Sequence, residues 1–291
     1  MSLSKSNQQD QYSVYIGPST GWLSAKICSD FRIHHKITES SSATAVEVVW
    51  SPGFRKRAFE QESIHEGVPY KSLHLSSFRG FQEPLTGEQN RQLEDIRAII
   101  DKFGFHNTTV HPDTISPFLY KVFENSGIPI SIENMDREKV FGQRADDLLI
   151  VMKNHHLGGV IDLQHAYELS CDTGESYTEI VKDLTNALER GRGISHVHVS
   201  GETSVAGQQI EGHAQLMVSS NAEVILGGIE TVFEITGKRH PIILEGDPLP
   251  EEPLRSSQSE FLSERIDRLA KIAIENISEE ISFVRRYCRF L

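Results

Sequence analysis

The sequence predicts a single (β/α)8 TIM barrel, and three observations indicate this fold. Eight short, apolar, β-like runs occur along the 291 residues, and most are separated by a segment with helical periodicity. Several runs, such as 45–50 and 241–244, are almost continuously apolar, which is typical of parallel strands covered on both faces. Eight strands alternating with helices in a chain of this length fit one barrel better than two domains. We therefore assign residues 12–291 to one barrel domain, preceded by a polar tail at residues 1–11.

The expected strands are spaced along the whole barrel domain. They cover residues 12–17, 44–50, 71–75, 107–111, 129–133, 159–163, 194–199 and 241–245. Helical segments are expected at 86–103, where apolar residues recur at helical spacing, and at 145–154, 177–190 and 222–235. The last segment, 260–289, is expected to form two helices, because Asn276 or Ser278 can cap a second helix ahead of Glu279 and Glu280.

Two connections are longer than a regular barrel needs. Residues 51–70 begin with a basic cluster, Arg55, Lys56 and Arg57, and residues 201–220 form a polar excursion between the seventh and eighth strands. Long loops at the carboxyl end of a barrel usually shape the substrate site. Both segments are therefore predicted to be substrate loops.

Composition limits the classes of function. Three widely spaced cysteines predict neither a disulfide framework nor a cysteine-rich zinc site. No apolar stretch approaches the roughly 20 residues that a membrane span needs, and the start lacks the apolar segment of a secretory signal, so we expect a cytoplasmic protein. The formal charge of −12 argues against wrapping of nucleic acid by a basic surface. It does not exclude an enzyme that acts on a phosphodiester, because bound divalent cations reverse the local field.

Residues of metal-ligand type fall at or just past the ends of six successive β-like runs. They are His74, His111, Glu133, Asp162, His165, His198, Glu211, His213 and Glu245. A parallel barrel gathers the carboxyl ends of its strands at one mouth, although these residues span more than half of the chain. Imidazole and carboxylate ligands favour zinc, with manganese or iron as alternatives. The pattern predicts a site for one to three divalent ions at the carboxyl-terminal mouth.

The carboxylates carry most of this prediction. Glu133, Asp162 and Glu245 each end an apolar run, where a buried carboxylate is costly unless it is paired or bound to metal. No Lys or Arg occupies an equivalent position at a strand end, so metal is the simplest source of the balancing charge.

The remaining histidines receive other assignments. His196 lies on the same side of its strand as His198, one layer deeper in the barrel, and is interpreted as a packing residue. His106, at the start of a strand, is interpreted as structural. Surface or loop positions are expected for His34, His35, His65, His155, His156 and His240.

Several short motifs resemble the xylose isomerase-like TIM barrels, and among them the type IV apurinic/apyrimidinic endonucleases. The stretch from Asp162 to His165 is similar to that family's Asp-x-x-His strand end, and His111 with the following proline matches its histidine-proline turn. Glu133 and Glu245 match the family's two strand-end glutamates, and Glu211-Gly-His213 stands where the family has Asp-x-His.

The resemblance implies a trinuclear site. His74 and His111 would hold the first metal, and Glu133 would bridge it to the second. Asp162, His198 and Glu245 would complete the second site, while His165, Glu211 and His213 would hold the third. The implied catalytic residues are Glu133 and Glu245, which would orient the attacking water, and Arg55, Lys56 and Arg57 would grip phosphate. Such a cluster suits hydrolysis of a phosphoester, including damaged, abasic DNA.

Three functions are compatible with these residues. The first is a metal-dependent hydrolase, which accounts for His74, His111 and the pair Glu211 and His213. The second is a sugar or sugar-phosphate isomerase or epimerase, in which one metal would hold the substrate while two glutamates move a proton. Residues 199–210 contain no arginine, which the epimerases place soon after the seventh-strand histidine. The third is a non-catalytic barrel that retains a metal site, since fold alone does not establish function.

Overall fold

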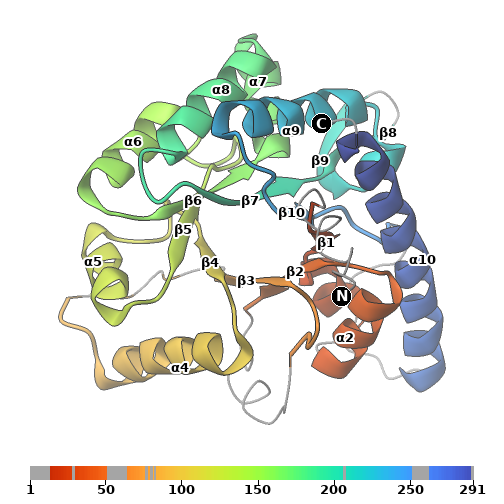
Figure 1. Cartoon of the computed structure of the whole chain (residues 1–291), viewed down its shortest axis with the longest axis horizontal. Helices are drawn as coiled ribbons and strands as arrows, with labels where there is room; N and C mark the ends of the chain where they lie inside the picture. The colour runs from red at the N-terminus through yellow and green to blue at the C-terminus, as the bar shows by residue number, and fades with distance from the viewer. Residues whose placement is uncertain are drawn as a thin grey trace, which may run out of the picture.

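The structure is a computed structural model, and it describes residues 14–27, 30–50, 64–75, 78, 81, 83–205, 208–250 and 262–289. The side chains of residues 203–212 and of Leu262 lie outside this description. Eight parallel strands form a nearly closed barrel with helices between them, as the sequence predicts (Figure 1). The strands are β1 (Ile16–Pro18), β2 (Ala45–Val49), β3 (Tyr70–Leu75), β4 (Asn107–Val110), β5 (Ile130–Glu133), β6 (Gly158–Asp162), β7 (Ile194–Val199) and β10 (Ile242–Leu244).

The order of neighbouring strands is β1-β10-β7-β6-β5-β4-β3-β2, so the first and second strands lie at the two ends of the hydrogen-bonded series. They meet through a bridge between Ser19 and Glu47, supported by a 2.9 Å hydrogen bond from Thr20 N to Glu47 O. A glycine is required at this junction, because a Cβ atom on Gly17 would lie 1.7 Å from the carbonyl oxygen of Ala45. The barrel therefore closes where β1 approaches the strand that carries Glu47.

Helices surround the barrel (Figure 1). They are α1 (Gly21–Lys26), α2 (Phe31–Ser40), α4 (Gly87–Phe103), α5 (Pro117–Ser126), α6 (Ala145–Asn154), α7 (Leu163–Thr173), α8 (Tyr177–Leu188), α9 (Ala222–Thr236) and α10 (Leu262–Cys288). Apolar faces of these helices pack against the barrel strands to form the core; Leu93, Ile96 and Ile99 of α4 are buried. No helix among the described residues is long and apolar enough to cross a membrane.

The carboxyl-terminal segment is one helix, so the expected break at Asn276 or Ser278 is wrong. Ser278 Oγ donates to the carbonyl oxygen of Ile274, one turn earlier in the same helix, and Asn276 Nδ2 donates to Pro248 O. Both side chains are therefore used without capping a new helix. Buried Ala273, Ile277 and Ile281 continue a single apolar stripe through the predicted break.

The segment after β7, which the sequence predicts to be a polar loop, forms an antiparallel hairpin. Strands β8 (Gly201–Val205) and β9 (Gln208–Ala214) pair from Gly201–Ala214 to Val205–Gln208. A short 3-10 helix, η2 (Leu216–Val218), then leads to α9. The hairpin directly follows the carboxyl end of β7, so it lies at the same end of the barrel as the predicted ligands.

Candidate metal centre

The carboxyl ends of six barrel strands bring six of the predicted ligands together. His74 lies in β3 and His198 in β7, Glu133 and Asp162 end β5 and β6, and His111 and Glu245 directly follow β4 and β10. Their positions follow from parallel strands in register, as in the pairing of Asp162 with His198 between β6 and β7. Two overlapping groups of ligand atoms result, and each group lies within 4.8 Å.

The first group consists of His74, His111 and Glu133. The Nε2 atoms of the two histidines lie 2.9 Å apart, so both rings direct the same nitrogen to one point. Glu133 Oε2 lies 3.7 Å from His74 Nε2 and 3.4 Å from His111 Nε2. Two imidazole nitrogens and one carboxylate oxygen that converge in this way form a ligand set suited to zinc.

The second group consists of Glu133, Asp162, His198 and Glu245. His198 Nδ1 lies 2.9 Å from Glu133 Oε1 and 3.4 Å from Glu245 Oε2. Asp162 Oδ1 accepts the backbone N–H of His165 at 2.8 Å and caps α7, which fixes the carboxylate at the mouth. One imidazole and three carboxylates form a harder ligand set than the first group, and this set suits manganese or iron as well as zinc.

Two buried carboxylate oxygens test whether these residues fit a metal ion. Glu133 Oε2 and Asp162 Oδ2 are both buried and accept no hydrogen bond from the described residues. A buried carboxylate oxygen without a donor is unfavourable, and native proteins rarely contain one that lacks a function. Each of these two oxygens belongs to one of the ligand groups. The residues therefore fit a bound cation, which would supply the contact that each oxygen lacks.

Burial and neighbouring charges shift the pKa values of the two catalytic candidates, Glu133 and Glu245, in opposite directions. Burial would raise the pKa of Glu133, but the adjacent His198 and His111 hold it well below its usual value. Burial raises the pKa of Glu245 to about 8, and the neighbouring Glu133 and Asp162 add to this effect. Without a bound ion, Glu133 is therefore the more readily ionised carboxylate of the pair and Glu245 the more readily protonated one.

His165 and His213 lie beside these groups, with ring centroids 6.0 Å apart. His165 Nδ1 donates to the carbonyl oxygen of Asn134 at 2.8 Å, which leaves Nε2 unprotonated in the neutral ring. His213 Nδ1 lies 2.9 Å from Ser200 Oγ. Neither histidine belongs to a ligand group among the described residues, and the side chain of Glu211 lies outside them. The third metal site therefore stays a prediction, as does the phosphate role of Arg55, Lys56 and Arg57, which lie outside the described residues.

Glu47 is a member of this centre that the sequence analysis missed. It lies in the middle of β2, is fully buried, and takes part in two further candidate groups, one with His196 and His198 and one with His74 and Glu245. Its signal in the sequence was a charged residue within the apolar run 45–50, which is costly unless the charge is paired. His196 lies deeper than His198, with its Nδ1 atom 2.8 Å from the hydroxyl of Tyr70.

Four histidines assigned to the surface or loops are buried instead: His34, His65, His155 and His240. Contacts with the helical layer explain two of them. The ring of His155 packs against Tyr120 with centroids 5.0 Å apart, and His240 Nε2 lies 3.0 Å from Thr236 Oγ1. These four histidines belong to the packed core outside the centre.

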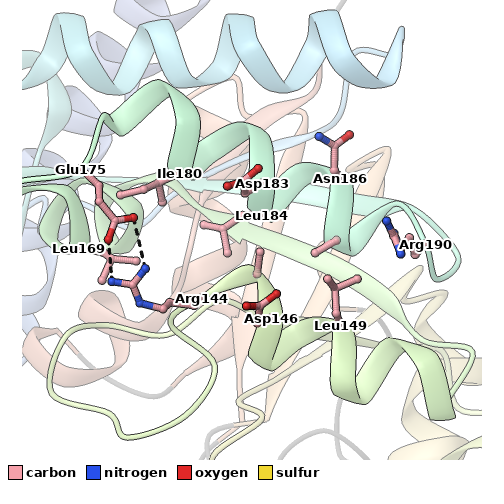
Figure 2. A pocket seen from close by; sticks show the side chains of 12 residues that line it. Arg144, Asp146, Leu149, Leu169, Glu175, Ile180, Asp183, Leu184, Asn186 and Arg190 are labelled. Atoms are coloured by element: carbon pink, nitrogen blue, oxygen red, sulfur yellow. Dashed lines mark hydrogen bonds and ion pairs between the residues drawn. The ribbon is translucent and has the colours of Figure 1, made fainter. Parts of the chain in front are cut away.

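A separate cavity of about 530 Å³ lies in the outer helical layer, lined by residues of α6, α7 and α8. Figure 2 shows the guanidinium of Arg144 paired with the carboxylate of Glu175 at one end of this cavity, with Arg190 at the other. Leu149 and Leu184 line its middle. The cavity is therefore distinct from the ligand groups at the barrel mouth.

No protein-family model matches the sequence, and no curated protein matches it. Solved structures do match. One is a D-psicose 3-epimerase with D-tagatose from Clostridium cellulolyticum H10, with a TM-score of 0.61, 11% identity, and coverage of 94% of this chain and 99% of that chain. The chain has the TIM-barrel fold of this epimerase.

Two further solved structures support this statement. A xylose isomerase domain-containing protein from Salmonella typhimurium has a TM-score of 0.57 and 14% identity, and the match covers 93% of this chain and 97% of that chain. Endonuclease IV from Thermus thermophilus has a TM-score of 0.52 and 17% identity, with 90% and 99% covered. The fold is thus shared by an epimerase and an endonuclease.

Proposed function

We propose that this protein is a divalent-metal-dependent hydrolase that acts on a phosphoester through a centre of at least two metal ions. The position of Glu133 is the observation that carries the proposal. Its Oε1 atom faces His198 in the second ligand group, and its Oε2 atom faces His74 and His111 in the first. A carboxylate with one oxygen in each group is suited to bridge two ions.

The chemistry of the proposed reaction follows from this arrangement. The residues of the two groups would hold ions that, when bound, would stabilise charge on a phosphoryl group and make water more acidic. Glu133, which stays ionised, holds both ligand groups in place. Glu245, the other strand-end glutamate of the second group, would help to hold the ions and orient the attacking water. Abasic DNA is among the candidate substrates, and Arg55, Lys56 and Arg57 are the proposed phosphate contacts.

A sugar isomerase or epimerase is the second candidate. The group of Glu133, Asp162, His198 and Glu245 is complete without His74 and His111, so it would hold one ion alone. Two of its members are glutamates with pKa values shifted in opposite directions, as proton transfer on a hydroxy-ketone requires. The fold is shared with an epimerase as well as with an endonuclease.

Metal stoichiometry combined with one variant distinguishes the two functions. Elemental analysis of protein purified without chelator or a metal-binding tag should give two or three ions per chain for the hydrolase and one for the isomerase. Phosphodiesters, abasic-site DNA and a panel of ketoses are then assayed with wild-type protein and with His111→Ala. We expect phosphodiester hydrolysis that the variant loses. Epimerisation of a ketose that the variant retains would instead establish the isomerase, and absence of bound metal after reconstitution would overturn both proposals.

A further inference from the structure

Glu47 directs its two oxygen atoms to different partners. Oε2 accepts a hydrogen bond from Thr109 Oγ1 at 2.8 Å and lies 3.2 Å from His196 Nε2. Oε1 lies 3.3 Å from His74 Nδ1 and 3.2 Å from His198 Nε2. Oε1 of Glu47 thus faces one nitrogen from each of two histidines that belong to different ligand groups.

In both of these histidines the opposite ring nitrogen faces the proposed metal positions. His74 presents Nε2 to His111 and Glu133, whereas His198 presents Nδ1 to Glu133 and Glu245. A nitrogen that binds a metal carries no proton, so the other nitrogen of a neutral imidazole must carry it. For both rings, that protonated nitrogen is the one that lies next to Glu47.

The surrounding groups are consistent with this assignment of protons. The Tyr70 hydroxyl lies 2.8 Å from His196 Nδ1 and can donate to it, which places the His196 proton on Nε2. This Nε2 atom lies 3.2 Å from Glu47 Oε2 and 3.0 Å from His198 Nε2; because His198 Nε2 carries its own proton in this assignment, the His196 N–H points to Glu47. Glu47 Oε1 is buried and has no hydrogen bond of normal geometry to any described residue, so its two lone pairs are free to accept once the rings of His74 and His198, 3.3 and 3.2 Å away, turn their N–H groups onto it. All four groups around the carboxylate then donate to it, and an ionised carboxylate can only accept.

We propose that Glu47 is a positioning residue that orients His74 and His198 for two different metal ions by accepting an N–H from each ring. The inference rests on the proposed metal centre and adds to it a residue that does not touch the ions. One carboxylate oxygen fixes the ring orientation and tautomer at both positions, in the way that carboxylates behind metal-binding histidines do in other proteins. Thr109 and His196 in turn hold the Glu47 carboxylate in place.

The competing interpretation is that Glu47 binds an ion directly, within one of its own two candidate groups. That arrangement requires His74 or His198 to coordinate through the nitrogen that faces Glu47. The two interpretations therefore differ in the number of ions that a Glu47 variant retains and in the nitrogen that each histidine uses.

The first test compares metal binding by wild-type protein and Glu47→Gln. The amide keeps the size of the side chain but removes its charge and cannot accept on both sides. We expect apparent affinity to fall by about 10- to 100-fold for both ions, while the number of ions bound at saturating zinc or manganese equals that of wild type. Glu280→Gln is the matched control, because Glu280 is equally buried but accepts from Leu216 N and not from the centre. Its metal affinity should equal that of wild type.

The outcomes of this titration are distinct. Wild-type affinity in Glu47→Gln would overturn the positioning role while leaving the metal centre intact. Loss of one ion at saturating metal would show that Glu47 is a ligand and would also overturn it. A wild-type protein that binds no ion would refute the metal centre itself, and the role of Glu47 with it.

The second test needs no variant and holds even if Glu47→Gln does not fold. Two-bond proton–nitrogen NMR correlations of the zinc-loaded, 15N-labelled wild-type protein report which nitrogen of each histidine carries a proton. We expect His74 to be protonated at Nδ1 and His198 at Nε2. The opposite tautomer at either residue, or a ring without a proton, would overturn the proposal.

Discussion

His198 Nδ1 lies 2.9 Å from Glu133 Oε1, so an imidazole of β7 and a carboxylate of β5 face each other at the barrel mouth. The other oxygen of Glu133 faces the histidines of the first ligand group. This shared carboxylate makes the two groups parts of one centre, and it determines how they should respond to mutation.

Glu133→Gln should weaken binding of both ions, because one side chain contributes an oxygen to each group. Asp162→Asn should remove one ion and leave the other, because Asp162 belongs to the second group alone. The asparagine retains the cap of α7, which Asp162 Oδ1 now provides. Elemental analysis after dialysis against buffered metal checks both results. Equal losses in the two variants would contradict the bridging position of Glu133.

Glu280 should make the stability of the protein depend on pH. Burial raises its pKa to about 7 from an ordinary value of 4.5. The folded state thus binds this proton more tightly than the unfolded state does, and the stability linked to it decreases as pH rises from 4.5 through about 7. The decrease corresponds to about 3 kcal/mol in the free energy of unfolding.

Glu280→Gln should remove this dependence, because the amide does not titrate and its oxygen can still accept from Leu216 N. Urea unfolding of both proteins from pH 5 to pH 8 measures the difference. The variant should gain stability relative to wild type as pH rises, and parallel curves would show that Glu280 does not titrate in this range.

Gly17→Ala should severely destabilise the barrel, because the added Cβ would overlap the carbonyl oxygen of Ala45, a backbone atom that cannot rotate away. We expect a loss of more than about 3 kcal/mol in the free energy of unfolding. Gly87→Ala is the control, since a Cβ there meets no atom within 4 Å and the position begins α4. Thermal unfolding of both variants provides the test, and equal midpoints would show that β1 and β2 lie farther apart.

Thr86→Ala should lower stability by about 1 kcal/mol, since Thr86 Oγ1 caps α4 by accepting from Gln89 N. Thr86→Ser retains the hydroxyl and should retain most of the stability. Chemical denaturation of the three proteins measures this, and an alanine variant as stable as wild type would mean that the capping box contributes little.

The strands and the positions of the candidate ligands at their ends could be predicted from sequence because both follow local rules. An apolar run that ends in a carboxylate, such as Ile130–Glu133, indicates a strand and its carboxyl end together. The continuous α10 could not be predicted, because Asn276 and Ser278 are typical capping residues whose side chains are engaged by Pro248 and Ile274. Tertiary contacts, rather than the local capping signals, determine that this segment is one continuous helix.

Glu47 was missed for a related reason. Its role depends on His74, Thr109, His196 and His198, which come from three other strands and are adjacent only in the closed barrel. The sequence shows a glutamate within an apolar run, and it does not show which groups surround that glutamate. The burial of His34, His65, His155 and His240 has the same origin, since polar residues of this kind carry no periodic signal.

The hairpin of β8 and β9 leaves and re-enters the barrel at neighbouring points. Gly201 and Ala214 are paired at its base, and Asp247 N, just past β10, donates to His213 O at 2.7 Å. The residues beyond this base contribute no strand to the barrel. The part of the hairpin between Thr203 and Ile210 can therefore change in length or sequence while the eight-stranded scaffold and both ligand groups stay fixed, which makes it the part of the barrel mouth that is freest to vary.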